Sequence, residues 1–205
     1  MLLYKINMDY YLIYQSLIFW YNMYLIFNDY RIDYCTLLHS IATGIGSQTL
    51  SLANNNLPYF ALGYSIYDLY SSIKLKKTDF IIHGILYSTG FFYCIYNDFM
   101  IPCNIAMMMN TSSIFLQILR IMKTFRYDII HPVYFMSASF IFTVLFIYYR
   151  LILFPYMIYN YLSITHSVFN NQSWYILLTG AISISILNIW WLFYIIKKFV
   201  GLING

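Results

Sequence analysis

Residues 132–159, PVYFMSASFIFTVLFIYYRLILFPYMIY, decide the fold of this chain. They form one apolar stretch interrupted by a single charged side chain, Arg150. The stretch is longer than the roughly 20 residues that a helix needs to cross the hydrocarbon core of a bilayer. Because only helices and closed barrels satisfy their backbone hydrogen bonds in that core, it is predicted to be a membrane-spanning helix that carries one guanidinium.

The composition of the whole chain extends this prediction. Hydrophobic residues make up 61% of the 205 residues and charged residues only 9%, a balance that excludes a soluble domain. Further apolar stretches, separated by short turns rich in Asn and Asp, indicate about seven spanning helices. Their expected ranges are 10–28, 32–53, 57–74, 79–96, 100–121, 132–159 and 173–196. The predicted fold class is therefore all-α, a polytopic membrane protein.

The basic residues predict the orientation of these helices. If the helices alternate across the bilayer, one side receives Arg31, Lys74, Lys76, Lys77, Arg120, Lys123, Arg126, Lys197 and Lys198. The positive-inside rule makes this side cytosolic, so the N-terminus is expected to be lumenal or outside and the C-terminus cytosolic. The charges are split among short loops, so no nucleic-acid partner is expected. The expected location is a membrane of endoplasmic-reticulum type or one derived from a host.

Polar side chains inside the apolar segments predict a functional cavity. A charge at the bilayer centre costs at least ~2.5 kcal/mol, so such residues usually face the interior of a helix bundle. Six of the segments each carry a polar stripe at three- and four-residue spacing, which places the stripe on one helix face. The predicted cavity lining is Thr36, His39, Thr43, Tyr64, Asp68, His83, Asn110, Ser113, Gln117, Arg150 and Asn188. Ordinary association of membrane helices through small polar residues is the alternative.

Three of these residues are candidates for catalysis. His39, Asp68 and His83 lie at similar depths from the predicted cytosolic side, given a helical rise of ~1.5 Å per residue. A His beside an Asp can act as an oriented general base, although a membrane His can equally be structural. No metal site or cofactor is expected, because the chain has no cluster of Cys and His. Asn171 begins an Asn-x-Ser sequon and is a predicted glycosylation site.

An ordered set of segments resembles the TLC-domain family. The segments are Arg31-x3-Cys35-Thr36-x2-His39-Ser40, Gly63-Tyr64-Ser65-Ile66-Tyr67-Asp68-Leu69, Asp79-Phe80-Ile81-Ile82-His83-Gly84-Ile85-Leu86, Asn110-Thr111-Ser112-Ser113-Ile114-Phe115-Leu116, Tyr149-Arg150-Leu151-Ile152-Leu153-Phe154-Pro155-Tyr156 and Leu187-Asn188-Ile189-Trp190-Trp191. The resemblance implies a TLC domain over residues 30–198 with a ring of six helices. A peripheral transmembrane helix would precede it at 1–29, and a short cytosolic tail would follow at 199–205.

The resemblance implies a connection with lipids more directly than it implies a reaction. The family includes ceramide synthases, which join the fatty chain of acyl-CoA to a sphingoid base, and smaller proteins tied to membrane lipid composition. Gly84 stands where the synthases have the second His of a pair, and Asn110 stands at an acidic position. The chain is therefore similar to the branch outside the ceramide synthases.

The expected function is to bind, sense or help move a lipid or acyl chain, or to influence membrane lipid composition, with membrane lipids as partners. One alternative is an acyltransferase that takes acyl-CoA as its substrate, with His83 as the general base and with His39 and Asp68 assisting. The other is a proton-coupled transporter that uses the same cluster. Whether the protein is an enzyme stays open at this point.

Overall fold

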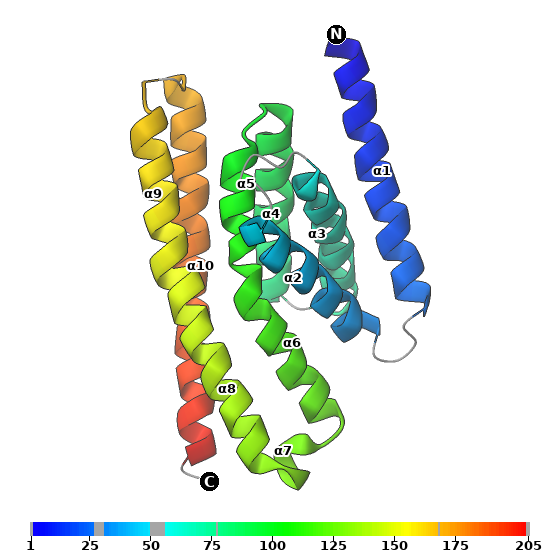
Figure 1. Ribbon diagram of the computed structural model, residues 1–205, viewed down its shortest axis with the longest axis vertical. Helices are drawn as coiled ribbons and strands as arrows, with labels where there is room; N and C mark the ends of the chain where they lie inside the picture. The colour runs from blue at the N-terminus through cyan, green and yellow to red at the C-terminus, as the bar shows by residue number, and fades with distance from the viewer. Residues whose placement is uncertain (1, 27–30, 50–55, 77, 168, 204–205) are drawn as a thin grey trace.

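The computed structural model describes residues 2–26, 31–49, 56–76, 78–167 and 169–203. These residues form helices and no strand (Figure 1). The elements are α1 (Leu2–Ile26), α2 (Arg31–Thr49), α3 (Leu57–Lys74), α4 (Thr78–Tyr96), α5 (Met100–Met108), α6 (Asn110–Thr124), α7 (Tyr127–Ile130), α8 (Pro132–Phe146), the π-helix η1 (Ile147–Leu153), α9 (Phe154–Thr165) and α10 (Asn171–Ile203). The predicted all-α class is confirmed.

Three helical rods among the described residues are long and apolar enough to cross a membrane. They are Met100–Thr124, Pro132–Thr165 and Asn171–Lys198. Each covers one of the last three predicted spans and runs past its predicted end. The other four predicted spans correspond to α1, α2, α3 and α4, and their crossing stays a prediction. The predicted ends of the first span, at 27–28, and of the second span, at 50–53, lie outside the described residues.

Two of the long rods change their winding. α5 and α6 join at Met109, whose N–H donates to the carbonyl of Ala106 at 3.3 Å. This bond spans three residues, as in a 3₁₀ turn, which is wound more tightly than an α-helix. α8 opens into the wider π turns of η1 shortly before Pro155. Proline has no N–H to donate, and its ring collides with the carbonyl four residues earlier, so the helix widens there. This wide turn carries Arg150.

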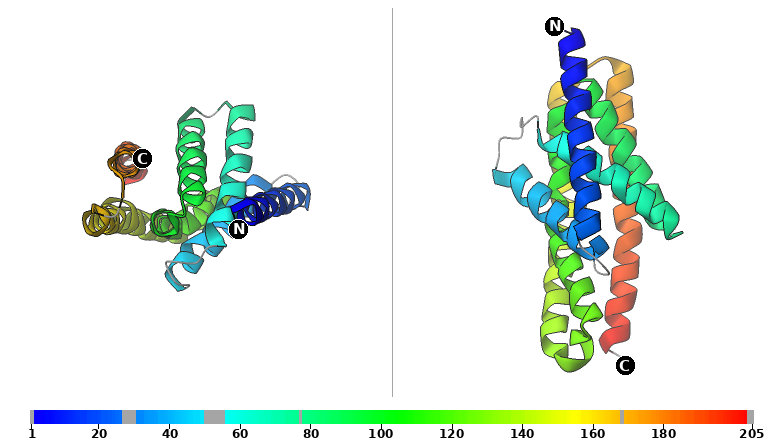
Figure 2. Two further views of the ribbon diagram at one scale, coloured as in Figure 1. Left: turned by 90° about the horizontal axis from the view of Figure 1, so that it is seen from above. Right: turned by 90° about the vertical axis from the view of Figure 1, so that its right-hand side faces the viewer.

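Six rods close a ring in the order α2, α3, α4, α10, α8–α9 and α5–α6, which matches the predicted ring of six. α1 packs outside it against α3 and α2 and lies at one edge of the molecule when viewed from above (Figure 2). The two termini lie at opposite ends of the molecule (Figure 1). We call the side with the α3–α4 turn, the α6–α7 turn and the C-terminus the basic end, because it carries Lys74, Lys76, Lys123 and Arg126.

Small residues bring the rods close together. On α1, Ser16 and Trp20 both donate to the carbonyl of Phe60 on α3, at 3.0 and 3.3 Å. On α2, Gly44 meets the backbone of α6 so closely that an added Cβ would lie 2.6 Å from the nitrogen of Thr111. Close backbone approach through small residues is the usual way in which membrane helices pack.

Candidate functional site: a polar cavity in the helix ring

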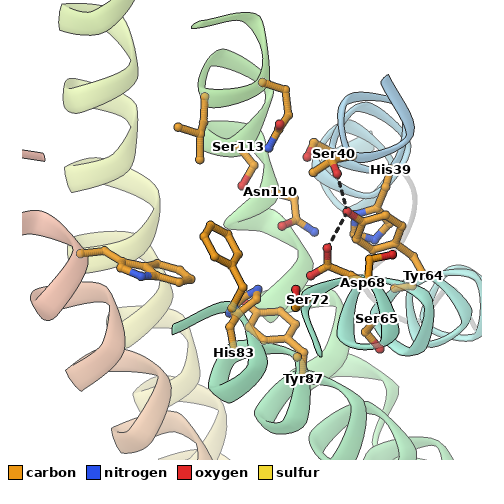
Figure 3. Close-up of a pocket in the computed structure, with 18 of the residues that line it drawn as sticks. His39, Ser40, Tyr64, Ser65, Asp68, Ser72, His83, Tyr87, Asn110 and Ser113 are labelled. Carbon is orange, nitrogen blue, oxygen red and sulfur yellow. Dashed lines mark hydrogen bonds between the residues drawn. The ribbon is translucent and has the colours of Figure 1, made fainter. Parts of the chain in front are cut away.

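A polar cavity of about 100 Å³ lies inside the ring near its basic end (Figure 3). Its walls come from α2, α3, α4, α6, η1 and α10. A cavity of this volume has room for several water molecules or for a small polar group. The predicted residues that line it are Thr36, His39, Tyr64, Asp68, His83, Asn110, Ser113, Gln117 and Arg150. The structure therefore brings the three catalytic candidates to one place.

Two predicted lining residues do not line the cavity. Thr43 is fully buried on α2, where α6 approaches too closely to leave space, and its Oγ1 accepts a hydrogen bond from Asn110 Nδ2 at 2.9 Å. Asn188 on α10 is also buried, and its Oδ1 accepts from Arg150 at 3.2 Å. The prediction was wrong about their place: both lie behind the wall and hold residues that do face the cavity.

Arg150 is buried among neutral partners. Its Nε donates to Ser112 Oγ at 3.0 Å, and one terminal nitrogen donates to Ser113 Oγ at 2.7 Å. The guanidinium lies 5.1 Å from the ring centroid of Phe146 and 5.6 Å from that of Trp191, within the range of cation–π attraction. Among the described residues, none of the groups that bind the Arg150 side chain is a carboxylate. The cavity therefore has a fixed positive charge in its wall.

Tyr64 separates His39 from Asp68. The Tyr64 hydroxyl donates to Thr36 Oγ1 at 2.7 Å and lies 3.5 Å from Asp68 Oδ1. Its ring stacks on the imidazole of His39, with the ring centroids 3.7 Å apart and the planes 10° from parallel (Figure 3). His39 and Asp68 therefore belong to a layered arrangement in which Tyr64 contacts both.

Four buried polar atoms around the cavity have no hydrogen-bond partner among the described residues. They are His39 Nε2, Ser40 Oγ, His83 Nδ1 and Tyr87 Oη. Leaving such an atom unpaired costs about 1–3 kcal/mol, and each case in a native structure needs an explanation. A molecule in the cavity that carries both hydrogen-bond donors and acceptors would satisfy them.

The comparison with known proteins agrees with this architecture. The family model described as the TLC domain matches residues 7–197. The chain belongs to the TLC-domain family. No curated protein and no solved structure matches it. It is an integral membrane protein of this family. The match also covers most of α1, and the predicted division into segments 1–29, 30–198 and 199–205 stays a prediction.

Gly84 and Asn110, the two positions that differ from the ceramide synthase pattern, both lie at contacts between helices. Gly84 faces α3, where an added Cβ would lie 3.0 Å from the Cβ of Leu69, so the position has little space for a histidine. Asn110 begins α6 and donates to Thr43, a hydrogen bond that a carboxylate could not make. Both substitutions suit the packing between neighbouring helices.

Several residues of the site were missed in the sequence. Ser40 and Ser65 line the cavity, and Ser112 binds Arg150. Each lies inside a segment that resembles the family, so the resemblance was the signal that could have found it. Trp191 also lines the cavity; it ends the family-like segment Leu187–Trp191, but helix periodicity alone does not separate it from an ordinary lipid-facing aromatic residue.

Asn171 begins α10, the helix that also carries the cavity residue Trp191. The Ser173 hydroxyl of its sequon is buried and accepts a hydrogen bond from the Tyr93 hydroxyl at 2.9 Å. Asn170 caps the helix through a 2.7 Å bond from the Ser173 N–H to its side-chain oxygen. The serine of the sequon is therefore already engaged in holding this helix start.

Proposed function

We propose that the polar cavity of this TLC domain binds the hydrogen-bonding group of a membrane lipid, and that the protein thereby binds, senses or helps move that lipid or influences membrane lipid composition. The observation that carries the proposal is the set of four unpartnered polar atoms around one cavity inside the helix ring of an integral membrane protein. Water alone could pair with them, but a lipid is the ligand that reaches such a site directly from its surroundings.

The charged and polar groups of the cavity favour a small ligand group that both donates and accepts hydrogen bonds. Arg150 supplies positive charge, Asp68 supplies negative charge, and hydroxyl and amide groups lie between them. At the basic end, Arg120 donates to Gln117 Oε1 at 3.3 Å and lies 5.3 Å from the ring centroid of Phe80. An alcohol, amine or carboxyl group on a lipid would find a donor and an acceptor in this space.

Native mass spectrometry of the purified protein tests the proposal. After exchange into a mild detergent with a total lipid extract, we expect one lipid class to stay bound at near-equal stoichiometry. Ser40→Ala removes one unpartnered hydroxyl and is expected to weaken retention about fivefold, the factor that corresponds to one hydrogen bond of roughly 1 kcal/mol. His83→Phe should act similarly.

Ser47→Ala is the matched control. Ser47 is also buried on α2, but its hydroxyl donates to the carbonyl of Gly44 at 3.1 Å and does not face the cavity. We expect unchanged lipid retention in this variant. Equal loss in Ser40→Ala and Ser47→Ala, or no enriched lipid class in the unaltered protein, would contradict the proposal.

The second candidate function is acyl transfer from acyl-CoA. The observation that favours it is the presence of His39, His83 and Asp68 around one cavity, with an unpartnered nitrogen on each imidazole. A neutral imidazole nitrogen of this kind can accept the proton of an attacking amine or alcohol. Incubation with labelled acyl-CoA and a panel of amines and alcohols tests it, and a product that His83→Ala abolishes is required.

We further propose that the basic end faces the cytosol, as the positive-inside rule predicts. The proposal is supported by the placement of Lys74, Lys76, Lys123 and Arg126 at two turns of the same end. An epitope tag at the C-terminus should be cleaved by protease added to sealed microsomes, whereas a tag at the N-terminus should be protected. The reverse pattern would refute this orientation.

A further inference from the structure

A second, larger pocket of about 340 Å³ lies on the other side of the polar cavity's wall. It is enclosed by α4, α5, α9 and α10 and is lined almost wholly by apolar side chains. Its volume falls at the lower end of the ~300–1,000 Å³ that ligand pockets usually have. Water has little to bind in such a space, so a hydrocarbon is the chemistry that fits it.

The pocket opens between α4 and α10. These two helices contact each other toward both ends: the rings of His83 and Trp191 lie 5.0 Å apart, and the Tyr93 hydroxyl donates to Ser173 Oγ at 2.9 Å. Between these contacts lie Gly90 on α4 and Gly180 on α10, both of which line the pocket. An added Cβ would meet nothing within 4 Å at either glycine. We call this opening the α4–α10 window.

The two glycines act here by leaving space. Glycine is a poor helix former, and its usual reason in a membrane helix is the close approach of a neighbouring backbone. Gly44 has that reason, since Thr111 lies against it, whereas Gly90 and Gly180 have no such neighbour. The missing side chains therefore leave open space between α4 and α10 at the window.

The pocket and the polar cavity share one wall. Tyr87 and Phe91 line both spaces, and they are only 7% and 4% exposed. The unpartnered hydroxyl of Tyr87 lies in this wall, close to His83, whose ring centroid is 4.2 Å from that of Tyr87. A molecule with its polar end in one space and its apolar chain in the other would have to pass these two rings, which would turn aside on binding.

We propose that the apolar pocket holds one hydrocarbon chain of a membrane amphiphile, which enters through the α4–α10 window while its polar end occupies the polar cavity. This inference rests on the function proposed above and adds the route and the site of the chain. The occupant is a single chain, because the pocket is at the small end of the ligand range and its opening is bounded by contacts on both sides.

Photolabelling of the full-length protein in phosphatidylcholine nanodiscs tests the inference. The probe is a fatty acid with a diazirine in the middle of its chain and a terminal alkyne for enrichment. Labelling at the pocket residues Leu177 and Ile184 is expected to saturate as the mole fraction of probe rises. Labelling at Ile182 and Ile186, which are exposed on α10 and do not line the pocket, should rise in proportion to the probe.

The double variant Gly90→Leu/Gly180→Leu should close the window. Because an added Cβ meets open space at both positions, the variant is expected to fold, and thermal unfolding and gel filtration would verify this. Saturable labelling should fall about tenfold, as the exclusion of roughly two buried methylene groups predicts. Ser183→Leu adds similar bulk to α10 outside the pocket and should leave labelling unchanged.

The outcomes separate this inference from the function on which it rests. Proportional labelling at Leu177, or saturable labelling that survives the double variant, overturns the window, even if Ser40→Ala lowers lipid retention as expected. Saturable labelling that the double variant removes supports the window. If it is accompanied by full lipid retention in Ser40→Ala and His83→Phe, the proposal for the polar cavity fails and the chain site stands alone.

Discussion

The polar cavity and the apolar pocket are neighbours with opposite chemistry. The polar cavity measures about 100 Å³ and is surrounded by hydroxyl, imidazole, carboxylate and guanidinium groups. The apolar pocket measures about 340 Å³ and is lined almost entirely by hydrocarbon. Only the aromatic wall of Tyr87 and Phe91 belongs to both. The interior of the ring is therefore divided along its length into a polar part and an apolar part.

The joint at Met109 produces this division. Before the joint, α5 packs inward against α2, α3, α4 and α9, and its side chains Ile105 and Met107 are almost fully buried. After the joint, α6 leaves the centre and packs against α2 and α8. The interior is therefore filled by α5 in one half, and a polar space remains beside α6 in the other.

The largest expected effect comes from removing the charge of the polar cavity. Arg150→Ala deletes three hydrogen bonds to Ser112, Ser113 and Asn188 and leaves a void against two aromatic rings. We expect the free energy of unfolding to fall by about 3 kcal/mol, since each bond contributes roughly 1 kcal/mol. Titration with SDS in mixed micelles would measure it. A variant as stable as the unaltered protein would show that neutral partners do not offset the burial of this cation.

The second-largest expected effect on stability compares a glycine at a close helix contact, Gly44, with a glycine at the α4–α10 window, Gly180. Gly44→Ala would press a methyl group onto the backbone of Thr111, and we expect a loss of about 2 kcal/mol from overpacking. Gly180→Ala adds the same methyl group to open space and should be neutral or stabilising by up to about 1 kcal/mol, because alanine is the better helix former. The same SDS titration compares the two variants. Equal losses would mean that the window is packed as tightly as the α2–α6 contact.

Two buried tyrosines provide a smaller and sharper contrast. The hydroxyl of Tyr64 donates to Thr36 at 2.7 Å, whereas the hydroxyl of Tyr87 has no partner among the described residues. Tyr64→Phe should cost about 1 kcal/mol of stability, and Tyr87→Phe should cost none in the lipid-free protein. With lipid present, Tyr87→Phe should lower retention about fivefold by native mass spectrometry. Unchanged retention would place the lipid group away from the shared wall.

The polar cavity could be predicted because charge in a membrane is expensive. His39, Asp68 and Arg150 stand out in apolar segments, and the three- and four-residue spacing assigned them to inward faces. Thr43 and Asn188 were placed wrongly, since periodicity gives the face of a helix but does not tell how closely the next helix approaches. The displacement of His39 from Asp68 by the Tyr64 ring depends on side-chain packing, which spacing does not reveal either.

The apolar pocket could not be predicted from the sequence. Leu177, Ala181 and Ile184 look like any lipid-facing or core residues, and Gly90 and Gly180 look like glycines at a close helix contact. Only the arrangement in space shows that these glycines face an opening. The changes of winding in the long rods could be predicted only in part. Pro155 gives a physical reason for η1, whereas no residue around Met109 indicates the joint between α5 and α6.

The smallest expected effect concerns the contact that bounds the window at the end opposite the basic one. The Tyr93 hydroxyl donates to Ser173 Oγ across α4 and α10 at 2.9 Å. A double-mutant cycle with Tyr93→Phe and Ser173→Ala should give a coupling energy of about 0.6 kcal/mol, the average for hydrogen bonds between membrane helices. If this bond bounds the window, Tyr93→Phe should also extend chain labelling toward Trp174, the residue after Ser173. A coupling energy near zero would mean that the packing of Trp174, whose indole N–H donates to the carbonyl of Leu162 at 3.1 Å, holds this end of α10 by itself.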